Sequence, residues 1–402
     1  MKSGLIDAAY AGSRAIARIQ QRFRRHRRAV VVPPAGEGSL GDAAMLNATG
    51  ATLKALGLAE VDLLLKPGWK AIEGFDHQAD GNAHFYGGGR RTFLPILTSL
   101  GRYSHAYFVG ADVADGVYNP LSVRRRLAVL AEAAAMGSEA TVLGCSFSET
   151  PDAGCVAALG TLPSSVQIKA RDPVSKARME AALDRPIDLV ADLAFLLPPR
   201  PDAPKAVDAA TWIKARRSAG DRIVAVNANY LIDARHAGFS AALGPLLKRL
   251  LAQGISLLLV PHDTRTDRSD QVILREAAAH VAADAADRVR FLEPEEPAMI
   301  KAVLGSVDLV VTGRMHVAIL AMGAGRPALS FGYQGKFEGL YQMLGLNEAG
   351  LLMSPSVLTD DPDAVVDAAC RHLADAETLA GHLAAALPAV RELALANFSG
   401  LR

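Results

Sequence analysis

Residues 307–332 read VDLVVTGRMHVAILAMGAGRPALSFG. The β-branched, apolar run 307–313 predicts a buried strand, the small and apolar run 315–324 predicts a helix, and 326–332 predicts a second strand. A strand, a helix and a strand in succession indicate a parallel sheet covered by helices, because parallel neighbours need a long crossover connection. An arginine and a histidine interrupt the pattern where the first strand gives way to the helix.

The same alternation extends along most of the chain. Before residue 198 we expect strands at 29–34, 61–65, 84–89, 105–110, 140–146 and 165–170, and helices at 42–57 and 120–137. After residue 221 we expect strands at 222–229, 255–262, 288–293, 307–313 and 326–332, and helices at 239–253, 269–284, 296–304 and 315–324. The fold class is therefore α/β, with two Rossmann-like domains that each contain an open parallel sheet, in a GT-B-like arrangement. Ligands of such sheets bind at the carboxyl ends of the strands, and we expect the cleft between the domains to hold them.

Length also favours two domains, because 402 residues exceed what one ordinary core contains. Four prolines between residues 198 and 204, followed by a charged stretch, indicate a linker. The expected divisions are a basic N-terminal helix (1–28), an N-terminal domain (29–197), a linker and the start of the next domain (198–221), a C-terminal domain (222–360) and a C-terminal helical segment (361–402).

Composition excludes several classes of protein. Lys and Arg number 43 against 42 Asp and Glu, so no overall positive field attracts nucleic acid. Cys145, Cys155 and Cys370 lack the spacing of metal ligands, and we expect neither a metal nor another cofactor. No apolar run approaches the roughly 20 residues of a membrane span. We therefore expect a cytoplasmic protein.

The N-terminal segment 5–28, LIDAAYAGSRAIARIQQRFRRHRR, leaves two interpretations open. Its apolar residues recur at helical spacing, and arginines lie on another face. A basic amphipathic helix can bind the anionic inner face of a membrane, which would make the protein peripheral to the inner membrane. The alternative is a solvated helix packed beside the first strand.

Arg314 and His316 mark a candidate anion site. They fall at the carboxyl end of a strand and on the first turn of a helix, where backbone N–H groups and the helix dipole favour negative charge. An arginine adds a two-pronged donor for phosphate or carboxylate, and a histidine can exchange a proton near neutral pH. The alternative is that Arg314 pairs with a carboxylate and that His316 only fills space.

Two glycine-rich turns are further candidates. In the first, Gly38 and Gly41 would let backbone N–H groups approach a ligand, and Asp42 lies at or beside the start of a helix. In the second, Gly88 is the middle residue of a triple glycine. The first turn matches neither a Walker motif nor G-x-G-x-x-G.

The order of these segments resembles the polysaccharide pyruvyl transferase family over about residues 29–350. The matching blocks, in chain order, are GSLGDAA (38–44), YGGGR (86–90), KARDPVSKA (169–177), ADLAFLL (191–197), LVPHD (259–263) and GRMHVAI (313–319). The last block, Arg-x-His, is the most specific. Ser39 stands where the family usually has Asn, and Ala43 stands where it has an acidic residue, so both departures fall on the acceptor half of the chain.

The resemblance implies transfer of a pyruvyl group from phosphoenolpyruvate to a sugar diol of a bacterial polysaccharide or of its lipid-linked precursor, which leaves a cyclic ketal and phosphate. It implies His316 and Asp42 as catalytic residues, with His316 handling the proton and Asp42 orienting or deprotonating the acceptor. The residues expected to bind substrate are Arg314, Met315, Lys336, His262, Asn229, Gly38, Gly41 and Gly88. The first domain would bind the acceptor and the second the donor.

Two other functions share this fold, because fold does not determine function. One is a nucleotide-sugar glycosyltransferase, which would bind a diphosphate at helix N-termini of the second domain. The other is a sugar- or anion-binding relative that has lost its chemistry.

Overall fold

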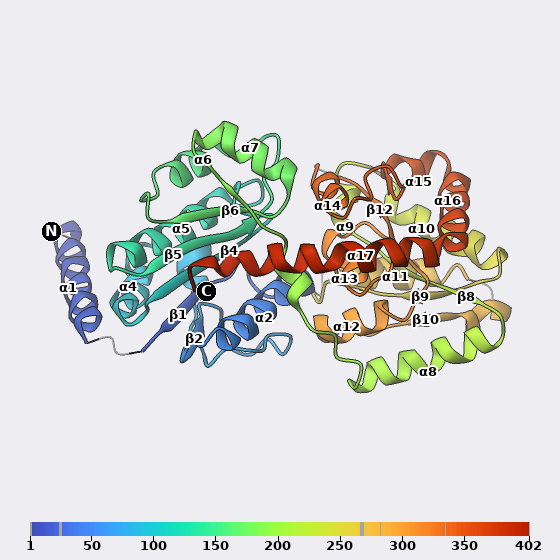
Figure 1. Ribbon diagram of the computed structural model, residues 1–402, viewed down its shortest axis with the longest axis horizontal. Helices are drawn as coiled ribbons and strands as arrows, with labels where there is room; N and C mark the ends of the chain where they lie inside the picture. Colours follow the sequence, from blue (N-terminus) through green and yellow to red (C-terminus); the bar gives the residue numbers. More distant parts are fainter. Residues whose placement is uncertain (1, 24–25, 266–268, 282, 334, 402) are drawn as a thin grey trace. The chain divides into compact units, whose positions relative to one another are not determined.

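The structure, a computed structural model, describes residues 2–23, 26–265, 269–281, 283–333 and 335–401. The chain divides into two compact units. The first contains Met1–Gly36, Met45–Leu196 and Leu393–Arg402, and the second contains Glu37–Ala44 and Leu197–Glu392. Each unit is a parallel sheet with helices on its faces (Figure 1).

The first unit holds a seven-stranded sheet in the order β3-β2-β1-β4-β5-β6-β7. Its strands are β1 (Arg28–Val32), β2 (Glu60–Leu63), β3 (His77–Gln78), β4 (His105–Ala111), β5 (Glu139–Cys145), β6 (Gln167–Ala170) and β7 (Asp188–Leu189). The order reverses between β1 and β4, as in doubly wound sheets. Val31 pairs in parallel with Leu63 on one side and with Tyr107 on the other.

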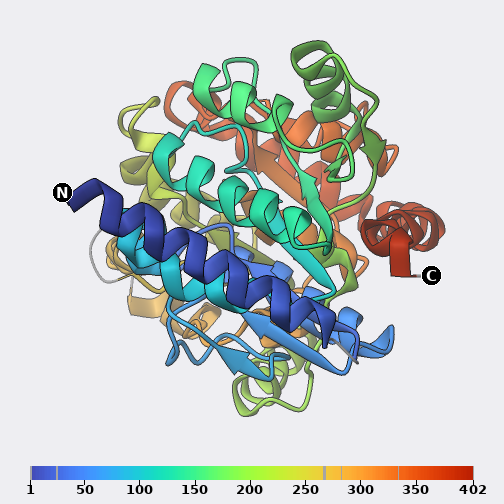
Figure 2. The ribbon, with the colours of Figure 1, turned by 90° about the vertical axis from the view of Figure 1, so that its left-hand side faces the viewer.

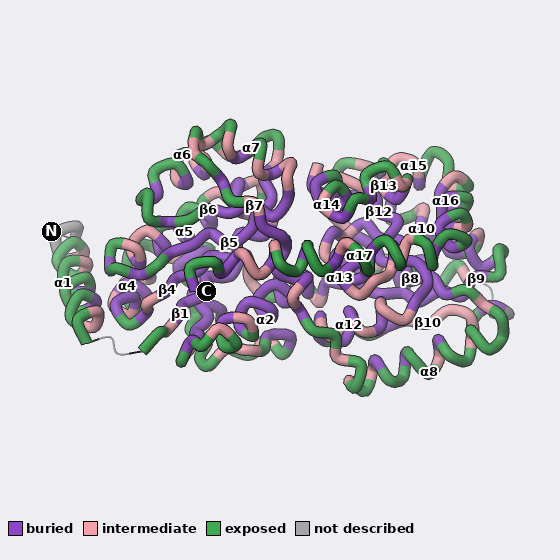
Figure 3. Tube along the Cα trace, viewed as in Figure 1, coloured by how far each residue is buried: buried purple, intermediate pink, exposed green. Residues whose placement is uncertain are grey.

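Helices cover this sheet because its strands are apolar on both faces. The helices are α1 (Lys2–Arg22), α2 (Leu40–Ala55), α3 (Asn82–Tyr86), α4 (Leu94–Ser99), α5 (Pro120–Ala135), α6 (Ala153–Gly160) and α7 (Pro173–Leu183). Val30, Phe108 and Val142 are fully buried in the main core of this unit. Strands β4 and β5 are buried along almost their whole length (Figure 3).

The second unit repeats the same topology with six strands in the order β10-β9-β8-β11-β12-β13. The strands are β8 (Arg222–Asn227), β9 (Ile255–Leu259), β10 (Val289–Phe291), β11 (Leu309–Thr312), β12 (Ala328–Phe331) and β13 (Leu352–Met353). The helices are α8 (Pro204–Ser218), α9 (Tyr230–Asp233), α10 (Phe239–Ala252), α11 (Asp270–Ala278), α12 (Pro297–Leu304), α13 (Met315–Gly323), α14 (Phe337–Met343), α15 (Ser356–Asp360), α16 (Pro362–Ala374) and α17 (Ala376–Leu395). Two Rossmann-like folds with open parallel sheets are thus confirmed.

Three expectations differ from the structure in detail. The strand expected at 84–89 is wrong, since these residues hold the end of helix α3 and the glycine turn after it. A short apolar run does not distinguish strand from helix by its periodicity. The expected linker contains helix α8, which begins with Pro204 at its first turn, where the missing N–H costs nothing. The segment 269–284 forms a shorter helix, α11.

The C-terminal helical segment contributes to both units. Residues 393–402 belong to the first unit, where the Asn397 side chain accepts a hydrogen bond from Gly144 N (2.7 Å) and donates one to Ala191 O (3.0 Å). Contrary to the composition argument, Ala376–Leu401 is long and apolar enough to span a membrane by length and composition. Length and composition are weak evidence for a span, and Asn397 and Phe398 near its end are buried.

Candidate active site

The Arg-x-His turn connects β11 to α13 in the second unit. β11 ends at Thr312, and Arg314 is the N-cap residue of α13, with extended backbone angles (φ −107°, ψ 123°). The Arg314 N–H donates to Thr312 Oγ1 (2.9 Å), and this bond fixes the turn. Met315 and His316 therefore occupy the first turn of α13, as the sequence predicts, with Met315 buried and His316 half-buried.

The guanidinium of Arg314 is held by two buried carboxylates. Its Nε donates to Asp270 Oδ2 (2.6 Å), and its Nη2 donates to Asp270 Oδ1 (2.7 Å) and to Asp263 Oδ2 (3.3 Å). Both aspartates have fully buried side chains. Burial tends to lower the pKa of Arg314, but the charges and hydrogen bonds of Asp270, with the charge of Asp263, raise it overall. Arg314 is therefore a fixed cation.

This pairing limits how Arg314 could contact a ligand. Its two-pronged edge binds Asp270, so that edge is not offered to a ligand in this structure. Its Nη1 has no hydrogen-bond partner among the described residues, and the side chain is 11% exposed. One N–H edge of an immobilised arginine remains for an anion.

Asp263 also binds a second arginine, Arg265. Asp263 Oδ1 accepts from the Arg265 backbone N (3.0 Å) and from its Nε (2.9 Å). The ring of Tyr230 has its centroid 5.3 Å from the guanidinium carbon of Arg314 and 5.9 Å from that of Arg265. Two arginines and two aspartates balance in charge. The positive field for an anion must therefore come largely from other groups, such as the N-terminus of α13.

His262 lies three residues after the end of β9 and is 1% exposed. Neither ring nitrogen has a hydrogen-bond partner among the described residues. Burial, and then the nearby Arg314 and His316, lower the pKa of His262 well below its ordinary value. The imidazole is therefore uncharged at neutral pH, and leaving its polar atoms unsatisfied costs about 1–3 kcal/mol. Most buried polar groups in proteins have a hydrogen-bond partner, so His262 is an exception.

The glycine-rich segment 37–44 groups with the second unit and packs on the end of β9. Ser39 forms an antiparallel bridge with Asp263, and the carbonyl of Gly38 accepts from Thr264 N (2.8 Å). A Cβ on Gly38 would lie 2.5 Å from Arg265 Cγ, and one on Gly41 would lie 2.3 Å from His316 Nδ1. These two glycines thus make room for side chains of the protein, whereas the sequence suggested room for a ligand.

Ser39 and Asp42 have separate roles at the start of α2. The Ser39 carbonyl accepts from Ala43 N (3.1 Å), and its Oγ accepts from Asp42 N (3.3 Å), so Ser39 caps the helix. Asp42 lies in the first turn and is 8% exposed. It is therefore not the cap, and its carboxylate lies in the same short segment as Gly41, which touches His316.

Lys336, Asn229 and Gly88 lie in different settings. Lys336 is the N-cap of α14 and is buried, with Nζ 5.7 Å from the centroid of the Tyr333 ring. Asn229 accepts from Leu231 N (3.1 Å) and donates to Gly313 O (2.8 Å), so its amide has a structural use. Gly88 belongs to the first unit, where a Cβ would lie 2.2 Å from Ala83 O. Local packing therefore accounts for Gly88.

Three members of this site escaped the sequence argument: Asp263, Asp270 and Arg265. Asp263 directly follows the Val-Pro-His stretch, and a charged residue just after a buried strand could have marked it as a site residue. Asp270 could not have been recognised in this way, because it lies in the first turn of α11, where acidic residues are common. A hollow of about 440 Å³ at the ends of β12 and β13, lined in part by Arg235, His236 and Glu338, was also not foreseen.

The contact between Gly41 and His316 gives a testable prediction. Gly41→Ala should displace the imidazole and lower turnover at least tenfold, since small misplacements of reacting groups are costly. Gly36→Ala is the matched control, because a Cβ there meets its nearest atom at 3.8 Å, an ordinary contact. Circular dichroism would show that both variants fold. Equal activity in the two variants would mean that the position of His316 is unimportant.

A family model for polysaccharide pyruvyl transferase matches residues 40–335, which include the glycine-rich segment from Leu40 onward, the Val-Pro-His stretch and the Arg-x-His turn. The chain belongs to the polysaccharide pyruvyl transferase family. It is accordingly a transferase, and polysaccharide biosynthesis is the context of its family. The match begins at Leu40 in the segment that packs on His316 and ends just before Lys336.

Solved structures of low sequence identity share the fold of this pyruvyl transferase family member. A putative UDP-N-acetylglucosamine 2-epimerase from Listeria monocytogenes is 10% identical with a TM-score of 0.57, over 90% of this chain and 91% of that chain. A sucrose-phosphate synthase from Thermosynechococcus elongatus is 15% identical with a TM-score of 0.56, over 92% and 96%. An α,α-trehalose 6-phosphate synthase from Burkholderia multivorans is 13% identical with a TM-score of 0.55, over 94% and 98%. These likenesses show the GT-B-like fold alone.

Proposed function

We propose that the protein transfers a pyruvyl group from phosphoenolpyruvate to two hydroxyls of a sugar in a bacterial polysaccharide or its precursor, as a cyclic ketal. The observation that carries this proposal is the family match, which spans the Arg-x-His turn together with Gly41, His262, Asp263 and Asp270. The fold does not favour this function over others, because enzymes with different activities share it.

The groups around the Arg-x-His turn suit a small polyanion. The start of α13 supplies the positive end of a helix dipole, and Arg314, its N-cap residue, adds the Nη1 edge of its guanidinium. Lys336, at the start of α14 after the neighbouring strand β12, adds a cation. The uncharged His262 can donate one hydrogen bond to a phosphate or carboxylate oxygen. We assign donor binding to these residues, with Arg314 held in place by Asp270.

The reaction sets two proton transfers. A proton must add to the methylene carbon of phosphoenolpyruvate, which makes the central carbon electrophilic, and a sugar hydroxyl then forms the first C–O bond there. The bond from the central carbon to the phosphate oxygen breaks as the second hydroxyl adds. In the overall reaction the two hydroxyl groups lose two protons. One of these is matched by the proton gained by the new methyl group, and the other by the proton gained by the released phosphate. We assign delivery of the methyl proton to His316.

Asp42 is our candidate for the group that orients or deprotonates the acceptor hydroxyl. It lies one residue after Gly41, which contacts His316, so both chemical groups belong to the same part of the second unit. A buried carboxylate in such a position can accept a proton from a hydroxyl within hydrogen-bond reach. An assay of phosphate release across a panel of glycans and lipid-linked sugars would identify the acceptor.

Donor binding tests this proposal before any acceptor is known. Phosphoenolpyruvate at 100 times its dissociation constant should stabilise the protein by about 2.7 kcal/mol, seen as a raised Tm, with chelator present. UDP-sugars and inorganic phosphate are the comparison ligands. Stabilisation by UDP-sugars with none by phosphoenolpyruvate would support a glycosyltransferase instead. Binding that is lost with chelator and restored by magnesium would contradict the metal-free donor site.

A further inference from the structure

Helix α1 packs against the first unit with one of its faces. It lies along α4 and the short helix Leu100–Arg102 (Figure 2). On this inner face Ala17 is fully buried and Ser13 nearly so. The contact is close, since a Cβ on Gly101 would lie 1.7 Å from Ala17 O. The helix is therefore a fixed part of the unit.

The opposite face of α1 is also apolar. Ile16, Ile19 and Phe23 are 47%, 55% and 72% exposed. Residues three and four apart share one side of a helix, so these side chains form one stripe. They are three of the eight exposed large hydrophobic residues in the described chain, and they fall within eight positions. A helix that only covered its own domain would carry polar residues on this outer face.

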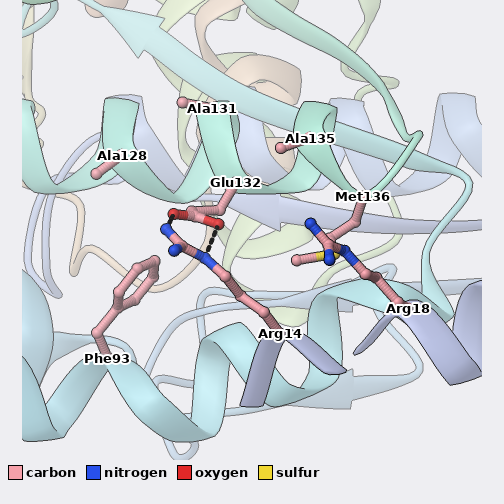
Figure 4. A pocket seen from close by; sticks show the side chains of 8 residues that line it. All are labelled: Arg14, Arg18, Phe93, Ala128, Ala131, Glu132, Ala135 and Met136. Carbon is pink, nitrogen blue, oxygen red and sulfur yellow. Dashed lines mark hydrogen bonds and ion pairs between the residues drawn. The ribbon is translucent and has the colours of Figure 1, made fainter. Parts of the chain in front are cut away.

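Basic side chains border the apolar stripe. Arg18 and Arg22 are exposed, and neither has an ion-pair partner among the described residues. Arg14, one turn before Arg18, forms an ion pair with Glu132 of α5. Arg14 and Arg18 line a hollow of about 330 Å³ between α1 and α5 (Figure 4). The floor of this hollow is mostly small or apolar: Phe93, Ala128, Ala131, Ala135 and Met136.

We propose that the outer face of α1 binds an anionic lipid bilayer. In this arrangement Ile16, Ile19 and Phe23 enter the boundary between headgroups and acyl chains, and Arg18 and Arg22 contact lipid phosphates. The combination of an exposed apolar stripe and basic flanks matches such a surface in both polarity and charge. The inference depends on α1 alone and is independent of the proposed reaction.

A second copy of the chain fits this face less well. A symmetric pair would place the same patch on both subunits in contact, and it would bring the unpaired arginines of the two copies together. Like charges at an interface oppose association. A bilayer that contains anionic lipid instead provides negative charges that pair with Arg18 and Arg22.

Vesicle binding of the full-length protein tests the proposal. At low salt the protein should sediment with vesicles of equal parts phosphatidylglycerol and phosphatidylcholine, and not with phosphatidylcholine alone. The triple variant Ile16→Gln, Ile19→Gln, Phe23→Gln should bind at least about tenfold more weakly. The double variant Arg18→Gln, Arg22→Gln should also lose about tenfold or more, and high salt should weaken binding of the parent.

A matched control removes three exposed apolar side chains elsewhere: Leu121→Gln, Val207→Gln, Val272→Gln. This control should bind vesicles like the parent, and Tm measurements should show that every variant folds. The proposal is overturned if the parent ignores anionic vesicles, or if the α1 triple variant binds them like the parent. It is equally overturned if sedimentation velocity shows a parent dimer that the triple variant dissolves while vesicles bind neither protein.

Discussion

Replacing His316 with alanine should lower turnover about 100-fold or more, because positioned proton transfer contributes about 10²–10⁴-fold to such reactions. His316→Gln should be similarly slow, since glutamine keeps hydrogen-bonding capacity but cannot deliver a proton. Both variants should bind phosphoenolpyruvate within a few-fold of the parent. The measurements are donor affinity and turnover on folded protein.

Glutamine is the decisive variant at this position. If His316→Gln turns over like the parent, His316 is a binding residue and the proton comes from another group. His262 would be a poor replacement, because its burial keeps the imidazole uncharged at neutral pH. In that case the uncharged ring would serve as a hydrogen-bond partner and the acid would have to be sought elsewhere.

Asp270→Asn should destabilise the second unit by about 3–5 kcal/mol, because it leaves the buried charge of Arg314 without its main partner. Asp363→Asn is the matched control: Asp363 pairs with Arg249 at 2.8 Å, but both side chains are exposed. Exposed pairs contribute about 0–1 kcal/mol. The contrast between the two variants measures what burial adds to the Arg314 pair.

Urea unfolding can report on the second unit separately. The chain has two tryptophans, Trp69 in the first unit and Trp212 in the second, so Trp69→Phe leaves one fluorophore in the unit of interest. In that background, equal midpoints for Asp270→Asn and Asp363→Asn would show that Asp270 does not hold Arg314. Replacing both partners, as in Arg314→Met with Asp270→Leu, should recover much of the loss.

The layout of both sheets could be predicted from the sequence because parallel, doubly covered strands are continuous apolar runs. Strands such as 105–110 and 307–313 were located to within a few residues. The error at 84–89 arose where an apolar run was too short to show a period. The assignment of residues 37–44 to the second unit could not be predicted, since it depends on contacts with Asp263 and Thr264, more than 200 positions away.

The site was predicted in position but not in its internal contacts. A strand that leads into a helix places Arg314 and His316 at the N-terminus of that helix whatever the rest of the fold does. The partner of Arg314 is 44 positions away, and local sequence does not reveal such a pair. Likewise the glycines at 38 and 41 signalled a close approach, but the sequence could not show that the approaching groups are Arg265 and His316.

Phosphate release from phosphoenolpyruvate is the most direct test of the proposed activity. The protein would be incubated with phosphoenolpyruvate and a panel of bacterial glycans and lipid-linked sugars, and phosphate and product mass would be followed together. We expect phosphate release that depends on one acceptor, with the mass of that acceptor raised by one pyruvate less one water. Release should be lost in His316→Gln. An acceptor panel that gives no phosphate with phosphoenolpyruvate, but does give products from UDP-sugars, would contradict pyruvyl transfer.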